Sequence, residues 1–172
     1  ACNTEFHDLQ HVLEVTLATV RIVHSAQEAV YHFDHFDLLI LLLSALMHDT
    51  GYIQLSSDDQ GTGGKLTLVH VERSIDFVRD YFHLNGYDET AISASSAIIK
   101  ATDLATKIDK IPFARKSWED LAKILATSDL LAQIADRLYL EKLLFLYKEF
   151  EEGMVPGFDS ELDLLEKTPG FL

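Results

Sequence analysis

Cysteine is almost missing from this chain of 172 residues, because Cys2 is its only example. No disulfide can form within the chain, and a zinc site built from several thiolates is excluded as well. A reducing compartment fits this composition, so we expect a cytoplasmic protein.

Basic residues are scarce too. The chain has 14 lysines and arginines against 28 aspartates and glutamates, which gives a formal net charge of −14. Nucleic acids and anionic membrane surfaces are polyanions, and an acidic chain without a basic stripe repels them. We therefore expect neither as a partner. A negatively charged substrate would need local positive charge, which a bound metal ion supplies.

Long hydrophobic runs are also absent. The longest run, residues 38–47, is about half of the roughly twenty residues that a membrane-spanning helix needs. The N-terminus lacks the basic start and apolar stretch of a signal peptide. The sequence therefore predicts a soluble protein, and a helical pattern that already begins at the first residues suggests a fragment of a longer chain.

Only three prolines interrupt the sequence, and its apolar residues recur at helical spacing with no extended alternation. This pattern predicts an all-α fold. The length and the 48% hydrophobic content fit one compact helical bundle, so we expect a single domain. We place its core at about residues 4–152 and a loosely packed tail at 153–172. The predicted helices cover residues 4–25, 36–49, 66–84, 89–102 and 117–152.

The first two predicted helices are apolar on nearly all sides, which indicates buried positions. A stripe on the first contains Phe6, Leu9, Leu13, Leu17 and Val20. The second is rich in leucine and stops before Gly51, where glycine can supply the left-handed conformation of a helix C-cap.

His7 and His11 are four residues apart on the first predicted helix. This spacing places both side chains on one face, about one turn apart. The pair could act together on a metal or a substrate. Alternatively, the two are hydrogen-bonded core or surface histidines.

His48 and Asp49 end the very apolar second helix. A carboxylate at a helix C-terminus faces the negative end of the helix dipole, and a bound cation removes that penalty. Adjacent nitrogen and oxygen ligands suit divalent zinc, manganese, iron or magnesium. The alternative is an ordinary helix end with Asp49 exposed to water.

Asp129 lies in an apolar helical segment that offers no polar face at its position. Burial of an unpaired carboxylate costs several kcal/mol, so a partner is expected. Ser128 or Asp129 could instead cap a new helix. Because two histidines and one aspartate already suit a metal, we favour Asp129 as a fourth ligand.

The order of these residues resembles the HD superfamily of metal-dependent phosphohydrolases, from about residue 6 to residue 150. A histidine on the first long helix is followed by a His-Asp pair and then by a distant aspartate in an apolar helix. Four blocks look like those of the cyclic nucleotide phosphodiesterase branch, namely Phe-His-Asp-Leu-Gln-His (6–11), Ala-Leu-Met-His-Asp (45–49), Ile-Lys-Ala-Thr-Asp-Leu (99–104) and Ala-Thr-Ser-Asp-Leu (126–130).

The resemblance implies one or two divalent metal ions, with zinc, manganese, magnesium, iron and nickel as candidates. The implied ligands of the first ion are His11, His48, Asp49 and Asp129, and Asp49 could bridge to a second ion. His7 would be the acid that protonates the leaving oxygen. His70 falls where many HD proteins have a further histidine near the second metal or the phosphate.

Three positions depart from the phosphodiesterase branch. Tyr52 stands where that branch has a histidine, Thr67 where it has an acidic residue, and Ala132 where it has an asparagine. The second-metal environment and the purine contacts of that branch are therefore not reproduced.

We expect a phosphodiesterase or phosphatase that hydrolyses a small phosphoester through a metal-activated water, with a nucleotide as the first candidate substrate. Two alternatives stay open. A di-iron oxygenase of the HD type uses the same ligands to activate dioxygen, and a helical signalling module could keep the fold and the metal without turnover.

Overall fold

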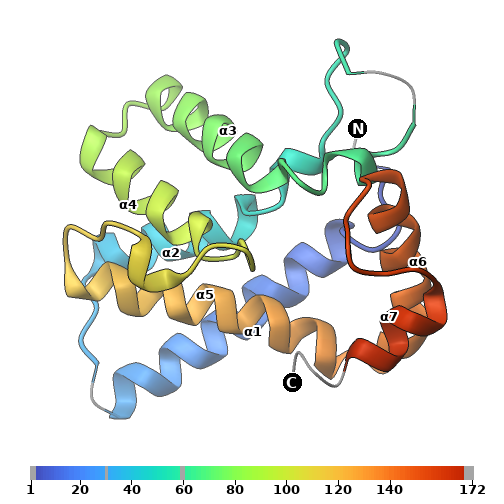
Figure 1. The fold of residues 1–172 in the computed structure, drawn as a ribbon. Coiled ribbons are helices and arrows are strands. Elements are labelled where there is room, and N and C mark those ends of the chain that lie inside the picture. Colours follow the sequence, from blue (N-terminus) through green and yellow to red (C-terminus); the bar gives the residue numbers. More distant parts are fainter. Residues whose placement is uncertain (1–2, 30, 59–60, 169–172) are drawn as a thin grey trace.

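The computed structural model describes residues 3–29, 31–58 and 61–168 (Figure 1). All regular structure within these residues is helical, which confirms the all-α prediction. The α-helices are α1 (Leu9–Ala29), α2 (His35–Met47), α3 (His70–Leu84), α4 (Glu89–Lys100), α5 (Lys116–Ala135), α6 (Tyr139–Glu152) and α7 (Glu161–Lys167). Three short 3-10 helices are η1 (Thr50–Tyr52), η2 (Gly63–Leu66) and η3 (Ile108–Lys110).

Side-chain caps mark the start of several helices. The Asp34 carboxylate accepts a hydrogen bond from the backbone N–H of Asp37 at α2, and Asp88 accepts one from Ala91 at α4. Each cap satisfies a backbone N–H that has no partner inside the helix.

The hydrophobic core lies where α1, α2, α4 and α5 pack against one another, while α3 covers α4 (Figure 1). Its fully buried members include Val15, Leu41, Ile98, Leu121 and Leu125. Helix α6 packs against η2 and α7 on the other side of the molecule. Among the described residues, no helix combines the length and the apolar character needed to cross a membrane.

Helix α1 is not buried on all sides, so that prediction is wrong. Of its predicted apolar stripe, Phe6 is buried but four side chains are 42–73% exposed, namely Leu9, Leu13, Leu17 and Val20. The buried face instead consists of His11, Val15, Thr19 and Val23. Thr19 tolerates burial because its hydroxyl donates to the Val15 carbonyl at 2.8 Å. The covered stripe therefore contains the candidate ligand His11.

The predicted helix over residues 117–152 is in fact two helices, α5 and α6. The chain turns at Asp136, whose backbone is extended with φ −67° and ψ 130°. The Asp136 carboxylate accepts the backbone N–H of Leu138 at 2.9 Å and pairs with Lys142. This break lets α6 leave the direction of α5 and reach the N-terminal segment.

Gly51 does not adopt the left-handed conformation that we predicted, because it is not among the residues with positive φ. A Cβ atom at Gly51 would lie 1.9 Å from the carbonyl oxygen of His70. Glycine is therefore required by close backbone approach. The left-handed glycine at the end of α3 is Gly86, with φ 75°.

The segment after Gly153 is not loosely packed, at least as far as residue 168. It contains α7, in which Leu164 is buried, and Phe158 stacks on Phe150 of α6 with ring centroids 5.4 Å apart. Apolar side chains thus hold this segment against α6. The remainder of the predicted tail, residues 169–172, lies outside the described residues.

Candidate metal centre

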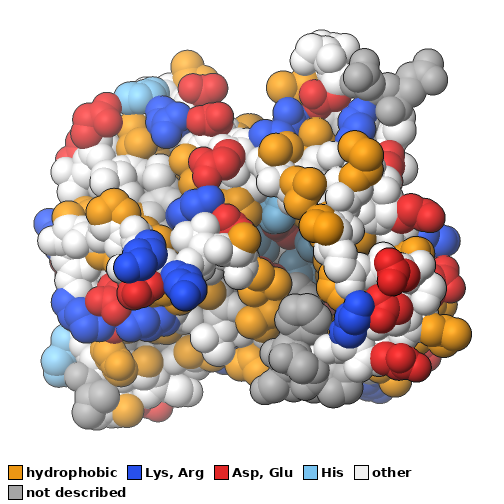
Figure 2. Space-filling model, viewed as in Figure 1, with side chains coloured by type: hydrophobic (Ala, Val, Ile, Leu, Met, Phe, Trp, Pro, Cys, Tyr) orange, Lys and Arg blue, Asp and Glu red, His pale blue; other side chains and the backbone are white. Residues whose placement is uncertain are grey.

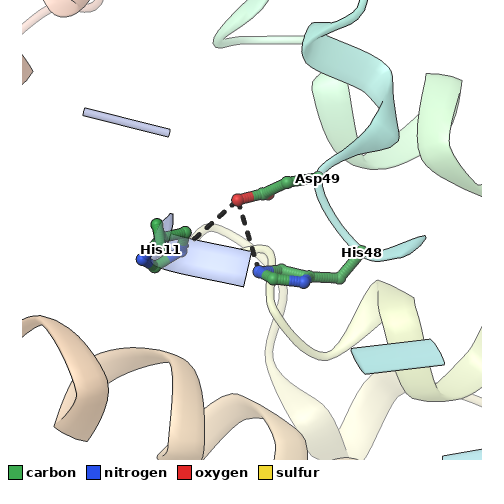
Figure 3. A group of neighbouring side chains, drawn as sticks. All are labelled: His11, His48 and Asp49. Carbon is green, nitrogen blue, oxygen red and sulfur yellow. Dashed lines mark ion pairs between the residues drawn. The ribbon is translucent and has the colours of Figure 1, made fainter. Parts of the chain in front are cut away.

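Three of the predicted ligands converge at one buried point (Figure 3). His11 comes from α1, and His48 and Asp49 come from the turn that follows α2. The Asp49 Oδ2 atom lies 3.4 Å from His11 Nε2 and 3.3 Å from His48 Nε2. One ligand atom from each of the three residues lies within 4.8 Å of the others, which is a grouping that could hold a metal ion.

Asp129 of α5 completes the set that the sequence predicts. Its Oδ1 atom lies 3.2 Å from His11 Nε2 and 3.8 Å from His48 Nε2. The packing of α1 against α5 and α2 thus brings together four side chains from three segments that are far apart in the sequence.

Local hydrogen bonds orient both histidines of this group. His48 Nδ1 lies 2.8 Å from the Ala45 carbonyl oxygen, which can only accept, so Nδ1 carries the hydrogen. In the neutral ring, the lone pair of Nε2 then faces Asp49, as metal-binding histidines require. The Asp8 carboxylate accepts the backbone N–H of His11 at 2.8 Å, which fixes the first turn of α1.

Three atoms at the centre are buried without a hydrogen-bond partner among the described residues, namely His11 Nε2, His48 Nε2 and Asp49 Oδ2. Each such atom costs about 1–3 kcal/mol when its hydrogen-bonding capacity is unused. A single cation placed between them would satisfy all three. The donor set therefore fits a divalent metal ion.

The electrostatics of the centre also favour positive charge. Burial opposes protonation of His11, but the nearby Asp129 and Asp49 carboxylates outweigh it and raise the His11 pKa to about 10. Burial alone would raise the pKa of Asp129, yet the adjacent histidines lower it well below its usual value. Among the described residues, the ion pairs of Asp49 and Asp129 are all with histidines. Either protons or a metal cation must therefore balance the buried Asp49 carboxylate and the half-buried Asp129 carboxylate.

His70, at the start of α3, faces the other oxygen of Asp49. Its Nδ1 donates to the Thr67 carbonyl at 2.6 Å, and its Nε2 lies 3.8 Å from Asp49 Oδ1. Burial lowers the His70 pKa, with Asp49 opposing this effect in part. One oxygen of Asp49 therefore faces His11 and His48, and the other faces His70. A carboxylate that lies between two ions would need this arrangement.

His7 is held beside the centre by a residue that sequence reasoning missed. The imidazole Nδ1 lies 2.6 Å from Glu149 Oε2, and Glu149 Oε1 accepts the backbone N–H of Phe6 at 2.8 Å. The rings of His7 and His11 are 5.5 Å apart between centroids. Glu149 is buried, but it lies in the charged end of α6, between Lys148 and Phe150. Three other glutamates on the same helix hide its burial in the sequence.

Tyr52 occupies the space between His7 and His70. Its ring stacks on His7 at 4.4 Å and on His70 at 4.5 Å, with interplanar angles of 13° and 20°. Burial raises the pKa of Tyr52 well above its usual value, so the residue remains a neutral phenol rather than a phenolate ligand. The phosphodiesterase branch has a histidine at this position. In this chain the position is Tyr52, whose ring orients two other histidines.

Comparison with known proteins gives one family. A family model described as HD domain matches residues 8–141, which is more than half of the chain. The matched region contains the four candidate ligands and His70, whereas His7 precedes it and Glu149 follows it. No curated protein and no solved structure matches the chain.

Proposed function

The chain belongs to the HD domain family, and from this premise we propose that it is a metal-dependent phosphohydrolase that cleaves a small phosphoester. One observation carries the proposal. Four converging ligand side chains lie directly beside His7, a histidine whose ring is fixed by a buried glutamate. Such an arrangement supplies both a metal site and a proton donor, the two components that phosphoester hydrolysis requires.

The metal would be held by His11, His48, Asp49 and Asp129. Imidazole nitrogens and carboxylate oxygens suit zinc, manganese, iron, magnesium or nickel. When bound, a divalent ion acts as a Lewis acid on the phosphoryl group and lowers the pKa of a coordinated water. Asp49 Oδ1 and His70 Nε2 would provide a place for a second ion or for a phosphate oxygen.

His7 would protonate the leaving oxygen. With Nδ1 hydrogen-bonded to Glu149, Nε2 is the nitrogen that would transfer the proton. Tyr52 stacks on the rings of both His7 and His70 and so restrains their orientation. We extend the proposal to a phosphodiesterase or phosphatase with a nucleotide-like substrate, in line with the motif blocks of the sequence.

The first test combines elemental analysis with an activity screen. Wild-type protein should carry at least one divalent ion per chain and hydrolyse phosphomonoesters or phosphodiesters. Asp49→Asn should lose the ion and at least about 100-fold in rate, because the metal contributes several kcal/mol to the transition state. Asp76→Asn, at an exposed position of α3, is the matched control. Wild-type metal content and turnover in Asp49→Asn would refute the proposal.

The di-iron alternative draws on the same placement of Asp49 between two groups of histidines. It predicts iron in the purified protein and oxygen uptake that depends on substrate, without release of phosphate or alcohol. A non-catalytic module predicts bound metal and neither reaction. The same preparation therefore separates all three functions.

A further inference from the structure

A mainly apolar cavity of about 230 Å³ lies between α5, α6 and α7. Its apolar lining includes Leu130, Ile134, Leu143, Leu146, Phe150 and Leu164. Figure 2 shows this face of the molecule hollowed between the α4–α5 side and the α6–α7 side. Hydrophobic side chains line both walls of the hollow, and histidine side chains are visible at its floor.

A hydrogen bond connects this cavity with the candidate metal centre. Gln133 lines the cavity, and its Nε2 donates to Asp129 Oδ1 at 3.3 Å. In addition, Leu130 directly follows Asp129 on α5, and Phe150 directly follows Glu149 on α6. One helical turn advances about 5.4 Å. A group in the cavity therefore lies within reach of a phosphoester bound at the centre.

The lining is poorly suited to a polar occupant. Among the described residues, no lysine, arginine, aspartate or glutamate lines the cavity. One of the two amide N–H groups of Gln133 is already used by Asp129, and the hydroxyl of Tyr139 is hydrogen-bonded to Thr168. Few donors or acceptors are left to form hydrogen bonds with a nucleotide base. Burial of apolar surface in this cavity is favourable.

We propose that, in place of the nucleotide-like substrate that the motif blocks suggest, this cavity receives an apolar organic group of the substrate, either an alkyl chain or an aryl ring attached to the phosphoester. The assignment rests on the proposed function, since it places the phosphoryl group at the metal centre. An apolar cavity of about 150 Å³ accommodates benzene. The present cavity of about 230 Å³ accommodates a phenyl or a hexyl group with room to spare.

Binding of non-hydrolysable phosphonates tests this assignment without turnover. Methyl-, butyl- and hexylphosphonate would be titrated calorimetrically into the metal-loaded protein. Affinity should increase about threefold for each added methylene, because each buries further apolar surface. Equal affinities for the three phosphonates would overturn the assignment. Tighter binding of the phosphonate analogue of adenosine monophosphate than of hexylphosphonate would overturn it too.

Variants locate the effect within the molecule. Leu146→Trp narrows the cavity from α6 and Ile134→Trp narrows it from α5, so each should reduce the hexyl-to-methyl affinity ratio about tenfold or more. The matched control is Leu17→Trp, which adds the same side chain to the exposed groove between α1 and α5. An unchanged ratio in a folded cavity variant, or an equal loss in Leu17→Trp, would contradict the proposal.

A second series separates this assignment from the hydrolase itself. Methyl, butyl and hexyl 4-nitrophenyl phosphodiesters share one leaving group, and their hydrolysis releases 4-nitrophenolate. Chain-length-dependent phosphonate affinity without any hydrolysis would support the cavity assignment and reject the hydrolase. Hydrolysis with no chain-length dependence in kcat/KM or in phosphonate affinity would support the hydrolase and reject the cavity assignment.

Discussion

Glu149 connects the last long helix with the residue that we assign as the acid. Its two carboxylate oxygens contact His7 Nδ1 and the backbone N–H of Phe6, so this one side chain holds both the imidazole and the backbone that precedes it. We treat Glu149 as a positioning residue, because it contacts His7 rather than the candidate ligands. Mutation of a neighbouring group that hydrogen-bonds to a functional side chain and orients it typically lowers activity about 10–100-fold.

Glu149→Gln should therefore reduce kcat about 10–100-fold while metal content stays unchanged. The loss should be larger for esters with poor leaving groups than for 4-nitrophenyl esters, because only poor leaving groups need the proton from His7. His7→Gln should show the same dependence on the leaving group. Glu151→Gln, at an exposed position of the same helix, serves as the control. A loss that is equal for all leaving groups, or a loss of metal, would reject this role.

Tyr52 allows a second prediction, which separates its ring from its hydroxyl. The ring stacks on two histidines, whereas the buried hydroxyl has no hydrogen-bond partner of normal geometry in the part of the chain that the structure describes. Tyr52→Phe should change the free energy of unfolding by less than about 1 kcal/mol. Tyr52→Ala should lower it by about 3–5 kcal/mol, because it leaves a large cavity. Urea unfolding measures both, and similar losses in the two variants would contradict the stacking role.

Residue chemistry explains which parts of the site were predictable from the sequence. Asp129 is conspicuous because it is the one acidic residue in the apolar part of its helix, and Asp49 because it follows such a helix directly. Glu149 is one of four glutamates in α6, so only the fold shows which of them is buried. Tyr52 could be recognised as a departure from the family pattern, but its place between two histidines depends on tertiary packing.

The turn after α2 and the start of α3 form one rigid unit. The Gly51 N–H donates to Ser74 Oγ at 2.8 Å, and Arg73 Nε donates to the Gly51 carbonyl at 2.9 Å. These contacts keep the backbone of Gly51 against that of His70 and so fix the distance between Asp49 and His70. The absence of a side chain at Gly51 is a condition for this approach.

Gly51→Ala should therefore destabilise the protein by more than about 2 kcal/mol, because its Cβ would meet backbone atoms that cannot move aside. Gly86→Ala provides the matched comparison. Gly86 has positive φ, and no heavy atom lies within 4 Å of the place that a Cβ atom would take there, so only backbone strain of about 1–2 kcal/mol applies. Denaturant unfolding measures both variants, and an equal or smaller loss for Gly51→Ala would disprove the close-approach argument.

Helical periodicity identified the segments of α1 to α6, with α5 and α6 joined into one helix, but not α7, nor the covered face of α1. Helix α1 carries two stripes at four-residue spacing, one with Leu13 and Leu17 and one with His11 and Val15. Only the neighbouring α5 and α2 determine which stripe is buried. Similarly, neither proline nor glycine marks the break at Asp136. That break depends on hydrogen bonds and an ion pair that form in the folded chain.

At the scale of the whole molecule, the net charge of −14 complicates any measurement of metal binding. An acidic surface attracts divalent cations nonspecifically, and such attraction is screened at high ionic strength. Cations held by the buried side chains of His11, His48 and Asp49 are screened much less. Salt dependence therefore distinguishes an ion at the centre from ions spread over the surface.

Removal of the metal with a chelator should lower the Tm by about 5–10 °C. A free metal concentration of about 100 times Kd stabilises the native state by about 2.7 kcal/mol, and each kcal/mol shifts the Tm of a chain of this size by about 2–4 °C. The difference should persist in 1 M salt, vanish in Asp49→Asn and remain in Asp76→Asn. Thermal unfolding with and without chelator measures it. A shift that disappears in salt, or that survives in Asp49→Asn, would assign the stabilising ions to the acidic surface instead of the buried centre.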